Sequence, residues 1–172
     1  MFKLRFPKED IRYWALKYKP SPMDEKLESE IVPRIKERGF IDKQDFLYIC
    51  RWKTPRTQKR CYNNSEEYIR EIARIALSTE NTQLQIEILT LLEGVGWPTA
   101  STILHFTHKE DYPILDFRTL WSLNCDVPNR YTNKFWEDYT FFCRGLSKEN
   151  GVSIRVLDKA LWQYSKENEK KS

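Results

Sequence analysis

The sequence has few glycines, few histidines and no long apolar run. Only five of its 172 residues are glycine, whereas a turn-rich β fold needs many turn residues, so helices are favoured. No apolar stretch approaches the roughly 18 residues of a membrane-spanning helix, and no signal peptide is recognisable. We therefore expect a cytoplasmic protein (near the nucleoid if the organism is a prokaryote), with reduced thiols and no membrane partner.

The chain also lacks the spacing of a metal-binding motif. Two histidines, His105 and His108, lie three residues apart, which is too few ligands for a metal site. The cysteines are not arranged in the close pairs of a zinc site or an iron–sulfur cluster. They are Cys50, Cys61, Cys125 and Cys143. We expect no iron–sulfur cluster and no organic cofactor.

Basic residues are concentrated in one segment. Residues 51–60, RWKTPRTQKR, hold five lysines and arginines and no acid, so without them the formal charge falls from +4 to −1. A local cationic segment attracts a phosphate backbone. Its candidate phosphate contacts are Lys53, Arg56, Lys59 and Arg60. The alternative is a solvated loop whose charges keep the protein soluble.

Apolar residues recur with a helical period through most of the chain. The pattern predicts an all-α fold of eight to ten helices in a single domain over residues 1–172, with a frayed tail at 166–172. Pro33 is expected to kink or restart one helix. Another is expected to bury Leu84, Ile88, Leu91 and Leu92. The expected helix caps are Asp24, Asp42, Ser65, Asn81 or Thr82, Thr132 or Asn133, and Ser153.

A glycine turn lies within a central unit of about residues 84–123. Gly94-Val95-Gly96 is expected to join two helices, the second of which starts near Trp97 and Pro98. Unpaired N–H groups at a helix start bind anions without regard to base sequence. The candidate backbone contacts are Gly94, Val95, Gly96, Trp97 and Thr99. The same spacing is also that of an ordinary turn between two helices.

The pattern Leu-x-Gly-Val-Gly-x-x-Thr-Ala at residues 92–100 precedes a helix and then Pro113-Ile114-Leu115-Asp116. This arrangement, about a fifth of the chain, resembles the helix-hairpin-helix DNA glycosylase superfamily, in which an aspartate at this spacing is catalytic. The resemblance implies a glycosylase-like fold, double-stranded DNA as partner and Asp116 as the catalytic residue. It also implies a monovalent cation, K⁺ or Na⁺, at the carbonyls of Leu92 and Val95.

The chain departs from that family in ways that narrow the expected activity. Members that also cleave the strand carry a lysine two residues after the second hairpin glycine, where this chain has Pro98. The resemblance therefore implies a monofunctional glycosylase without a Schiff-base lyase step. The chain is also shorter than typical relatives, and it lacks the cysteine cluster that some of them use.

The chemistry expected of Asp116 is electrostatic. A carboxylate stabilises the positive charge that develops on the deoxyribose as the base leaves, and it can orient or deprotonate water. The base must first be flipped into a pocket, for which Trp52, Trp136 and Tyr139 are candidate pocket or intercalating residues. The alternative roles are plain: Asp116 is a helix cap and the aromatic residues are core.

Three functions are therefore left open by the sequence. The first is a monofunctional DNA glycosylase acting on a flipped modified or damaged base. The second is a non-catalytic helix-hairpin-helix protein that binds DNA, with Asp116 only a cap. The third is a helical interaction module without DNA, which leaves the basic segment 51–60 unexplained.

Overall fold

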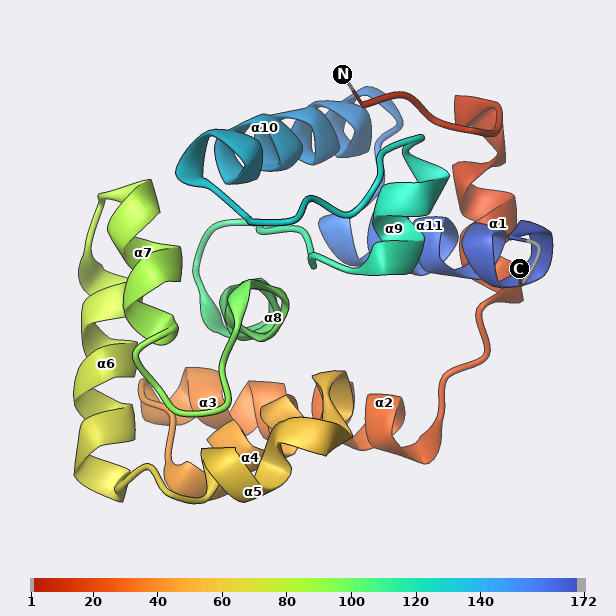
Figure 1. The fold of residues 1–172 in the computed structure, drawn as a ribbon. Helices are drawn as coiled ribbons and strands as arrows, with labels where there is room; N and C mark the ends of the chain where they lie inside the picture. Colours follow the sequence, from red (N-terminus) through yellow and green to blue (C-terminus); the bar gives the residue numbers. More distant parts are fainter. Residues whose placement is uncertain (1, 170–172) are drawn as a thin grey trace. The chain divides into compact units, whose positions relative to one another are not determined.

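In the computed structural model, which describes residues 2–169, every regular element of the described chain is helical (Figure 1). The all-α expectation is thus confirmed. The chain divides into two compact units: Met1–Lys19 with Asp111–Ser172 (unit 1), and Pro20–Glu110 (unit 2). No helix within the described residues combines the length and apolarity needed to cross a membrane.

Unit 2 is built around α8 (Trp97–Thr107), which contacts α3, α4 and α7 and buries seven of its eleven residues. In Figure 1 this helix is seen nearly end-on, in green. α6 packs against α4 and α7. The other elements of unit 2 are α2 (Pro22–Lys26), η2 (Leu27–Ile31), α3 (Val32–Arg38), α4 (Lys43–Lys53), η3 (Pro55–Thr57), α5 (Gln58–Cys61), α6 (Glu66–Ser78) and α7 (Thr82–Leu89).

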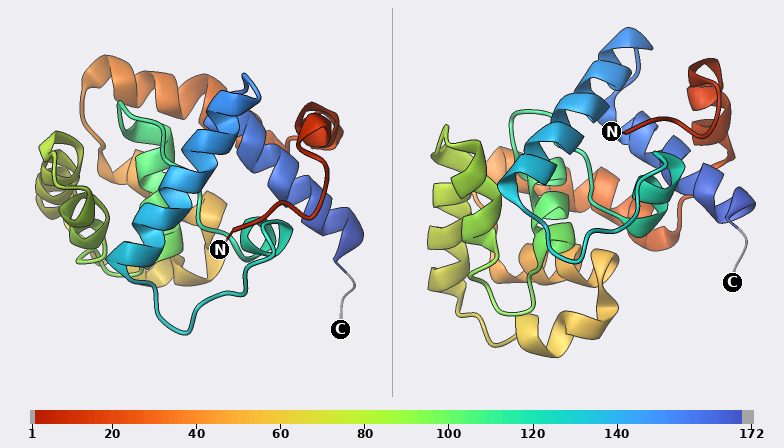
Figure 2. Two further views of the ribbon diagram at one scale, coloured as in Figure 1. Left: turned by 90° about the horizontal axis from the view of Figure 1, so that it is seen from above. Right: turned by 45° about the horizontal axis from the view of Figure 1, so that its top comes forward.

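Unit 1 is organised by α11 (Ile154–Asn168), which packs against α1, α9 and α10; α1 (red) lies next to α11 (dark blue) in both views of Figure 2. The remaining elements are η1 (Lys8–Asp10), α1 (Ile11–Lys17), α9 (Phe117–Ser122) and α10 (Asn133–Glu149). Of the tail predicted to fray, Lys166 to Asn168 belong to α11, and the last three residues lie outside the described part.

Most predicted helix caps are confirmed. Asp42, Ser65, Asn81, Thr132 and Ser153 each accept a hydrogen bond from the backbone N–H three residues on. The prediction for Asp24 is wrong, because Ser21 is the cap of α2 and Asp24 bonds back to its N–H. The helix starts earlier because Pro22, which has no N–H to satisfy, suits the first helical turn.

The predicted inward face of α7 is wrong in part. The helix ends at Leu89, and Leu84 and Leu91 are 41% and 60% exposed. The buried residues of α7 are Gln85, Ile86 and Leu89, and Leu92 is buried in the loop that follows. α7 contacts both α6 and α8, so tertiary packing and not the apolar period alone selects the buried face.

Pro33 lies at a change of helix type, where a kink or restart was predicted. It lies in the first turn of α3, directly after the π-helical turn η2. Because proline lacks an N–H and its ring crowds the preceding turn, the regular helical hydrogen bonds cannot continue through it. The prediction of a kink or restart at Pro33 agrees with this change of helix type.

Candidate functional site

Residues 90–96, here called the glycine loop, connect α7 to α8. The N–H of Val95 donates to the carbonyl of Leu92 at 3.1 Å, and both side chains are buried. Gly94 has φ +83°, in the left-handed region that favours glycine, and Gly96 is the extended N-cap of α8. Two buried apolar side chains therefore anchor a loop whose glycines lie nearer the surface.

Gly94 lies directly against the basic segment. A Cβ atom at this position would lie 2.6 Å from Sγ of Cys61 and 3.0 Å from the carbonyl oxygen of Thr57. Both residues belong to the turn and short helix, η3 and α5, that follow α4. The backbone of Gly94 lies so close to Thr57 and Cys61 that no residue with a Cβ atom fits at this position. The glycine loop and the basic segment are therefore in tight contact.

Asn64 joins the same two segments with hydrogen bonds. Its side-chain amide donates to the carbonyls of Glu93 (3.0 Å) and Cys61 (2.9 Å), and its Oδ1 accepts from the N–H of Glu93 (2.9 Å). The side chain is nearly fully buried, with the residue 4% exposed. No local sequence pattern links Asn64 to a residue 29 positions later, so only the structure reveals this contact.

The cations of this region face solvent. Arg56, Lys59 and Arg60 are exposed, and none of them forms an ion pair among the described residues. Lys53 is half-buried. We call the surface formed by residues 53–60 and the glycine loop the basic face. The two predicted DNA-binding segments are thus brought together by the fold.

The basic face also carries one acid that the sequence analysis did not consider. Glu93 is exposed, and its carboxylate accepts a hydrogen bond from the side-chain amide of Asn63 at 2.9 Å. A carboxylate at this position repels a phosphate. The net positive charge of the face therefore comes from the segment 53–60 and is reduced by the glycine loop.

The start of α8 has no side-chain cap. Thr99 is 3% exposed as a whole residue, so the exposed part of this helix end is the backbone of Gly96 and the half-buried Trp97. The hydroxyls of Ser101 and Thr102 donate to the carbonyl of Pro98, at 2.8 and 2.9 Å. Main-chain N–H groups and the helix dipole are therefore the anion-binding features of this helix end.

Trp52 is held by neighbours within unit 2. Its indole N–H donates to Oδ1 of Asp24 at 3.2 Å, and its ring meets that of Phe106 edge to face at 5.3 Å. The residue is half-buried. The structure thus gives Trp52 a packing role, and its predicted intercalating role stays a prediction.

Asp116 is the N-cap of α9. Its Oδ1 accepts a hydrogen bond from the N–H of Arg118 at 2.9 Å, and the residue is half-buried. Residues 113–116, here called the aspartate segment, are fixed from within unit 1. The hydroxyl of Tyr139 donates to the carbonyl of Ile114 (2.7 Å), and that of Thr119 to the carbonyl of Asp116 (2.8 Å).

The other aromatic candidates are core residues. Trp136 and Tyr139 are each 1% exposed, and Tyr112 stacks on Trp136 with ring centroids 5.6 Å apart. Burial raises the pKa of Tyr139 well above its ordinary value, so its hydroxyl stays a neutral donor. As placed, both rings offer a base no surface, and Tyr139 instead supports the aspartate segment.

Tyr131 is a neighbour of Asp116 that the sequence analysis missed. Burial raises its pKa, and the negative charge of Asp116 raises it further. The ring also meets that of Phe135 edge to face at 5.7 Å. No spacing rule connects Tyr131 with Asp116, since the two lie on irregular segments either side of α9.

No group of three or more His, Cys, Asp or Glu residues within the described chain could hold a metal ion. His108 is buried, and its Nδ1 accepts from the N–H of Glu110 at 3.0 Å. For the implied monovalent cation the donors are backbone carbonyls. That of Leu92 already accepts the N–H of Val95, which leaves its second lone pair for an ion.

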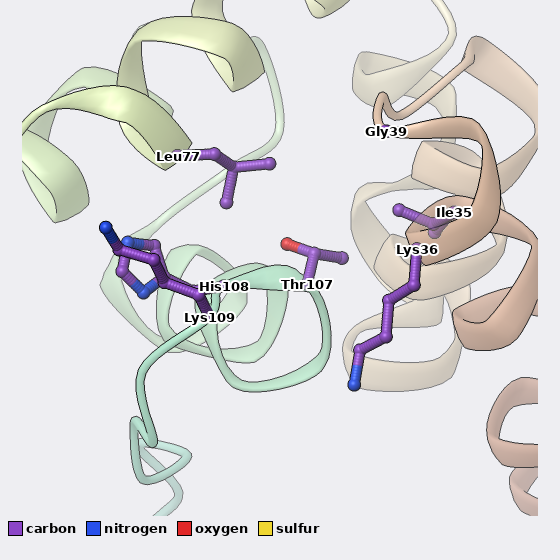
Figure 3. A pocket seen from close by; sticks show the side chains of 7 residues that line it. All are labelled: Ile35, Lys36, Gly39, Leu77, Thr107, His108 and Lys109. Carbon is purple, nitrogen blue, oxygen red and sulfur yellow. The ribbon is translucent and has the colours of Figure 1, made fainter.

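A pocket of about 480 Å³ lies in unit 2 between α3, α6 and the end of α8 (Figure 3). In Figure 3, Leu77 and Ile35 point toward Thr107 from opposite sides. Lys36, Gly39, His108 and Lys109 complete the lining. None of the predicted site residues lines this pocket.

No model of a known protein family matches the chain, and no solved structure gives a significant match.

Proposed function

We propose that this protein binds double-stranded DNA through its basic face and hydrolyses the bond between a flipped base and its sugar. The observation that supports this most is the contact of Gly94 with Thr57 and Cys61. It joins a cationic segment to a loop that leads into a helix N-terminus. Those are two separate features that attract the same ligand, a phosphate backbone.

In this proposal the two halves of the basic face have different tasks. Arg56, Lys59 and Arg60 supply long-range attraction and phosphate contacts, which depend on salt. The main chain of the glycine loop and of the start of α8 fixes the position of one phosphate by direct hydrogen bonds. Both kinds of contact are independent of base sequence, as a protein that searches for a rare base requires.

Asp116 is proposed to supply the charge for bond cleavage. Its carboxylate stabilises the developing positive charge on the deoxyribose and orients or deprotonates the attacking water. Its cap hydrogen bond with Arg118 is compatible with this role, because a carboxylate has two oxygens and several lone pairs. Pro98 has no amine, so no Schiff base forms at that position.

A second function is favoured by a specific observation. Asp116 does cap α9, and a cap alone accounts for an aspartate at that position. The second proposal is accordingly a DNA-binding protein without catalysis, which uses the same basic face. The two proposals differ only in what Asp116 does.

DNA binding is tested by fluorescence anisotropy with a labelled duplex at rising salt. The variant Arg56→Gln, Lys59→Gln, Arg60→Gln removes three exposed charges from the basic face. A matched control, Lys26→Gln, Lys36→Gln, Lys109→Gln, removes three exposed charges elsewhere in unit 2. We expect the first variant to weaken binding about tenfold or more and to flatten the salt dependence, and the control to do much less. Equal losses in both would refute a specific basic face.

Catalysis is tested with duplexes that carry single modified bases, followed by alkali to break abasic sites. Asp116→Asn is the informative variant, because an asparagine Oδ1 still accepts the Arg118 N–H and preserves the cap. We expect wild type to give breaks and Asp116→Asn to bind DNA equally but give none. If no base in a broad panel is removed, the non-catalytic proposal replaces this one. If Asp116→Asn stays as active as wild type, the protein removes bases but the role proposed for Asp116 is refuted.

A further inference from the structure

Cys50 on α4 and Cys61 at the end of α5 form a buried thiol pair. Both residues are 0% exposed, and α5 packs against α4. The side chain of Gln58, three residues before Cys61, donates to the carbonyl of Leu47, three residues before Cys50, at 3.1 Å. Each thiol also alters the pKa of the other. The hydroxyl of Thr57 lies 3.8 Å from Sγ of Cys61. The same sulfur is the atom that a Cβ on Gly94 would strike. The pair thus lies directly beneath the junction of glycine loop and basic segment, and the proposed function does not use it.

The two thiols are chemically unequal. Hydrogen bonds from Cys50 and Thr57, with the charge of Arg60, lower the pKa of Cys61 to about 7 although burial opposes this. The bond to Cys61 and burial raise the pKa of Cys50. Burial also raises the pKa values of Cys125 and Cys143. A thiolate beside a thiol is the arrangement of a reactive cysteine with its resolving partner.

We propose that a peroxide converts Cys50 and Cys61 into a reversible disulfide that alters DNA binding by the basic face. The Cys61 thiolate attacks one peroxide oxygen, the O–O bond breaks, and the leaving hydroxide takes up a proton as water. This step oxidises Cys61 to a sulfenic acid. The Cys50 sulfur then attacks the Cys61 sulfur, the S–O bond breaks, and the Cys50 proton leaves with the hydroxide as a second water.

Access to the pair requires only a local opening. α5 is four residues long, and so short a helix has little stability of its own. The residues on either side of Cys61, Arg60 and Tyr62, are exposed. Short surface segments can open locally at less than the global unfolding free energy, and such an opening admits a molecule as small as hydrogen peroxide.

Disulfide formation acts on the junction because Cys61 is part of it. A disulfide holds its sulfur atoms about 2 Å apart, closer than two unbonded sulfur atoms can approach. Drawing Cys61 toward α4 draws it away from Gly94 and shifts the carbonyl that accepts from Asn64. The chemical part of this inference stands alone, whereas the effect on DNA rests on the proposed function.

The chemistry is tested first on the full chain. Wild type is treated with hydrogen peroxide, free thiols are blocked with N-ethylmaleimide, and peptides are mapped by mass spectrometry without reduction. We expect a Cys50–Cys61 disulfide that dithiothreitol reverses, and an oxidation rate that rises with pH through about 7, as the thiolate population rises. Cys50→Ser should trap a sulfenic acid at Cys61, and Cys125→Ser should leave the disulfide unchanged. The proposal would be overturned if Cys50 and Cys61 stayed as free thiols under conditions that oxidise Cys125.

The effect on binding is measured on the same wild-type preparations, so it needs no variant. We expect the oxidised protein to bind duplex DNA about tenfold more weakly than the reduced protein, and re-reduction to restore the affinity. If the disulfide forms but the affinity for DNA is unchanged, the proposed effect of the disulfide on the basic face is overturned. If the reduced protein binds no DNA, the proposed function fails. Hydrogen exchange of residues 90–96 before and after oxidation then shows whether the disulfide alters the glycine loop.

Discussion

The glycine loop in unit 2 and the aspartate segment in unit 1 are both irregular backbone held by a buried polar side chain. Asn64 holds the first and Tyr139 holds the second. The difference lies in what surrounds them. Gly94 of the glycine loop meets Cys61 and Thr57 through bare backbone, whereas the aspartate segment is held by the hydroxyl of Tyr139, whose ring lies against that of Trp136. We therefore expect atoms added to the glycine loop to destabilise the protein, and atoms removed from the support of the aspartate segment to do the same.

Gly94→Ala gives the largest expected effect. The added methyl group meets Sγ of Cys61 and two backbone atoms within 3.0 Å, at a residue with φ +83°. We expect a loss of about 3 kcal/mol of unfolding free energy, from overpacking and backbone strain together. Chemical denaturation of the purified variant measures it.

Gly39→Ala is the matched control for this prediction. Gly39 has φ +77°, but nothing lies within 4 Å of an added Cβ. It should therefore lose only the strain, about 1 kcal/mol. Equal losses at Gly39 and Gly94 would show that close contact does not distinguish the glycine loop.

Asn64→Ala is expected to cost slightly less. It removes a side chain that makes three hydrogen bonds to the backbone of Cys61 and Glu93, and it leaves buried polar groups without these partners. We expect a loss of about 2 kcal/mol. DNA binding by the basic face should weaken as well, since the glycine loop loses its clamp. Asn63→Ala, which changes an exposed neighbour, should leave stability within about 0.5 kcal/mol.

Tyr139→Phe tests the aspartate segment by removing one oxygen atom. The carbonyl of Ile114 loses its donor at 2.7 Å and keeps only the hydroxyl of Thr119 at 3.4 Å, while the ring stays in place. We expect a loss of about 1 kcal/mol in unfolding free energy, and a fall in base excision if Asp116 is catalytic. Tyr68→Phe on the exposed face of α6 is the control and should change neither quantity. A Tyr139→Phe variant as stable as wild type would contradict the support that we assign to this hydroxyl.

Glu93→Gln is expected to have the smallest effect. It removes the acid of the basic face and keeps a side chain that accepts from Asn63. Affinity for duplex DNA should rise about twofold to threefold at low salt, and the gain should disappear as salt screens the charge. Glu80→Gln removes an exposed acid elsewhere in unit 2 and should leave the affinity unchanged.

Much of the fold followed from local chemistry. Five predicted caps are observed because a short polar side chain beside an apolar period satisfies the first N–H groups of its own helix. The cap of α2 was misplaced because Ser21 and Asp24 form a reciprocal capping box, in which either residue fits the pattern. The face of α7 was misassigned because two neighbours, α6 and α8, compete for it.

The candidate site divides in the same way. The charge of residues 51–60, the glycine turn and the position of Asp116 before a helix are properties of the sequence alone, since each depends on adjacent residues. Tertiary structure decided that Gly94 meets Cys61, that Asn64 clamps Glu93, and that Tyr139 supports Ile114. These contacts join residues 25 to 33 positions apart, and only the packing of whole helices sets such distances.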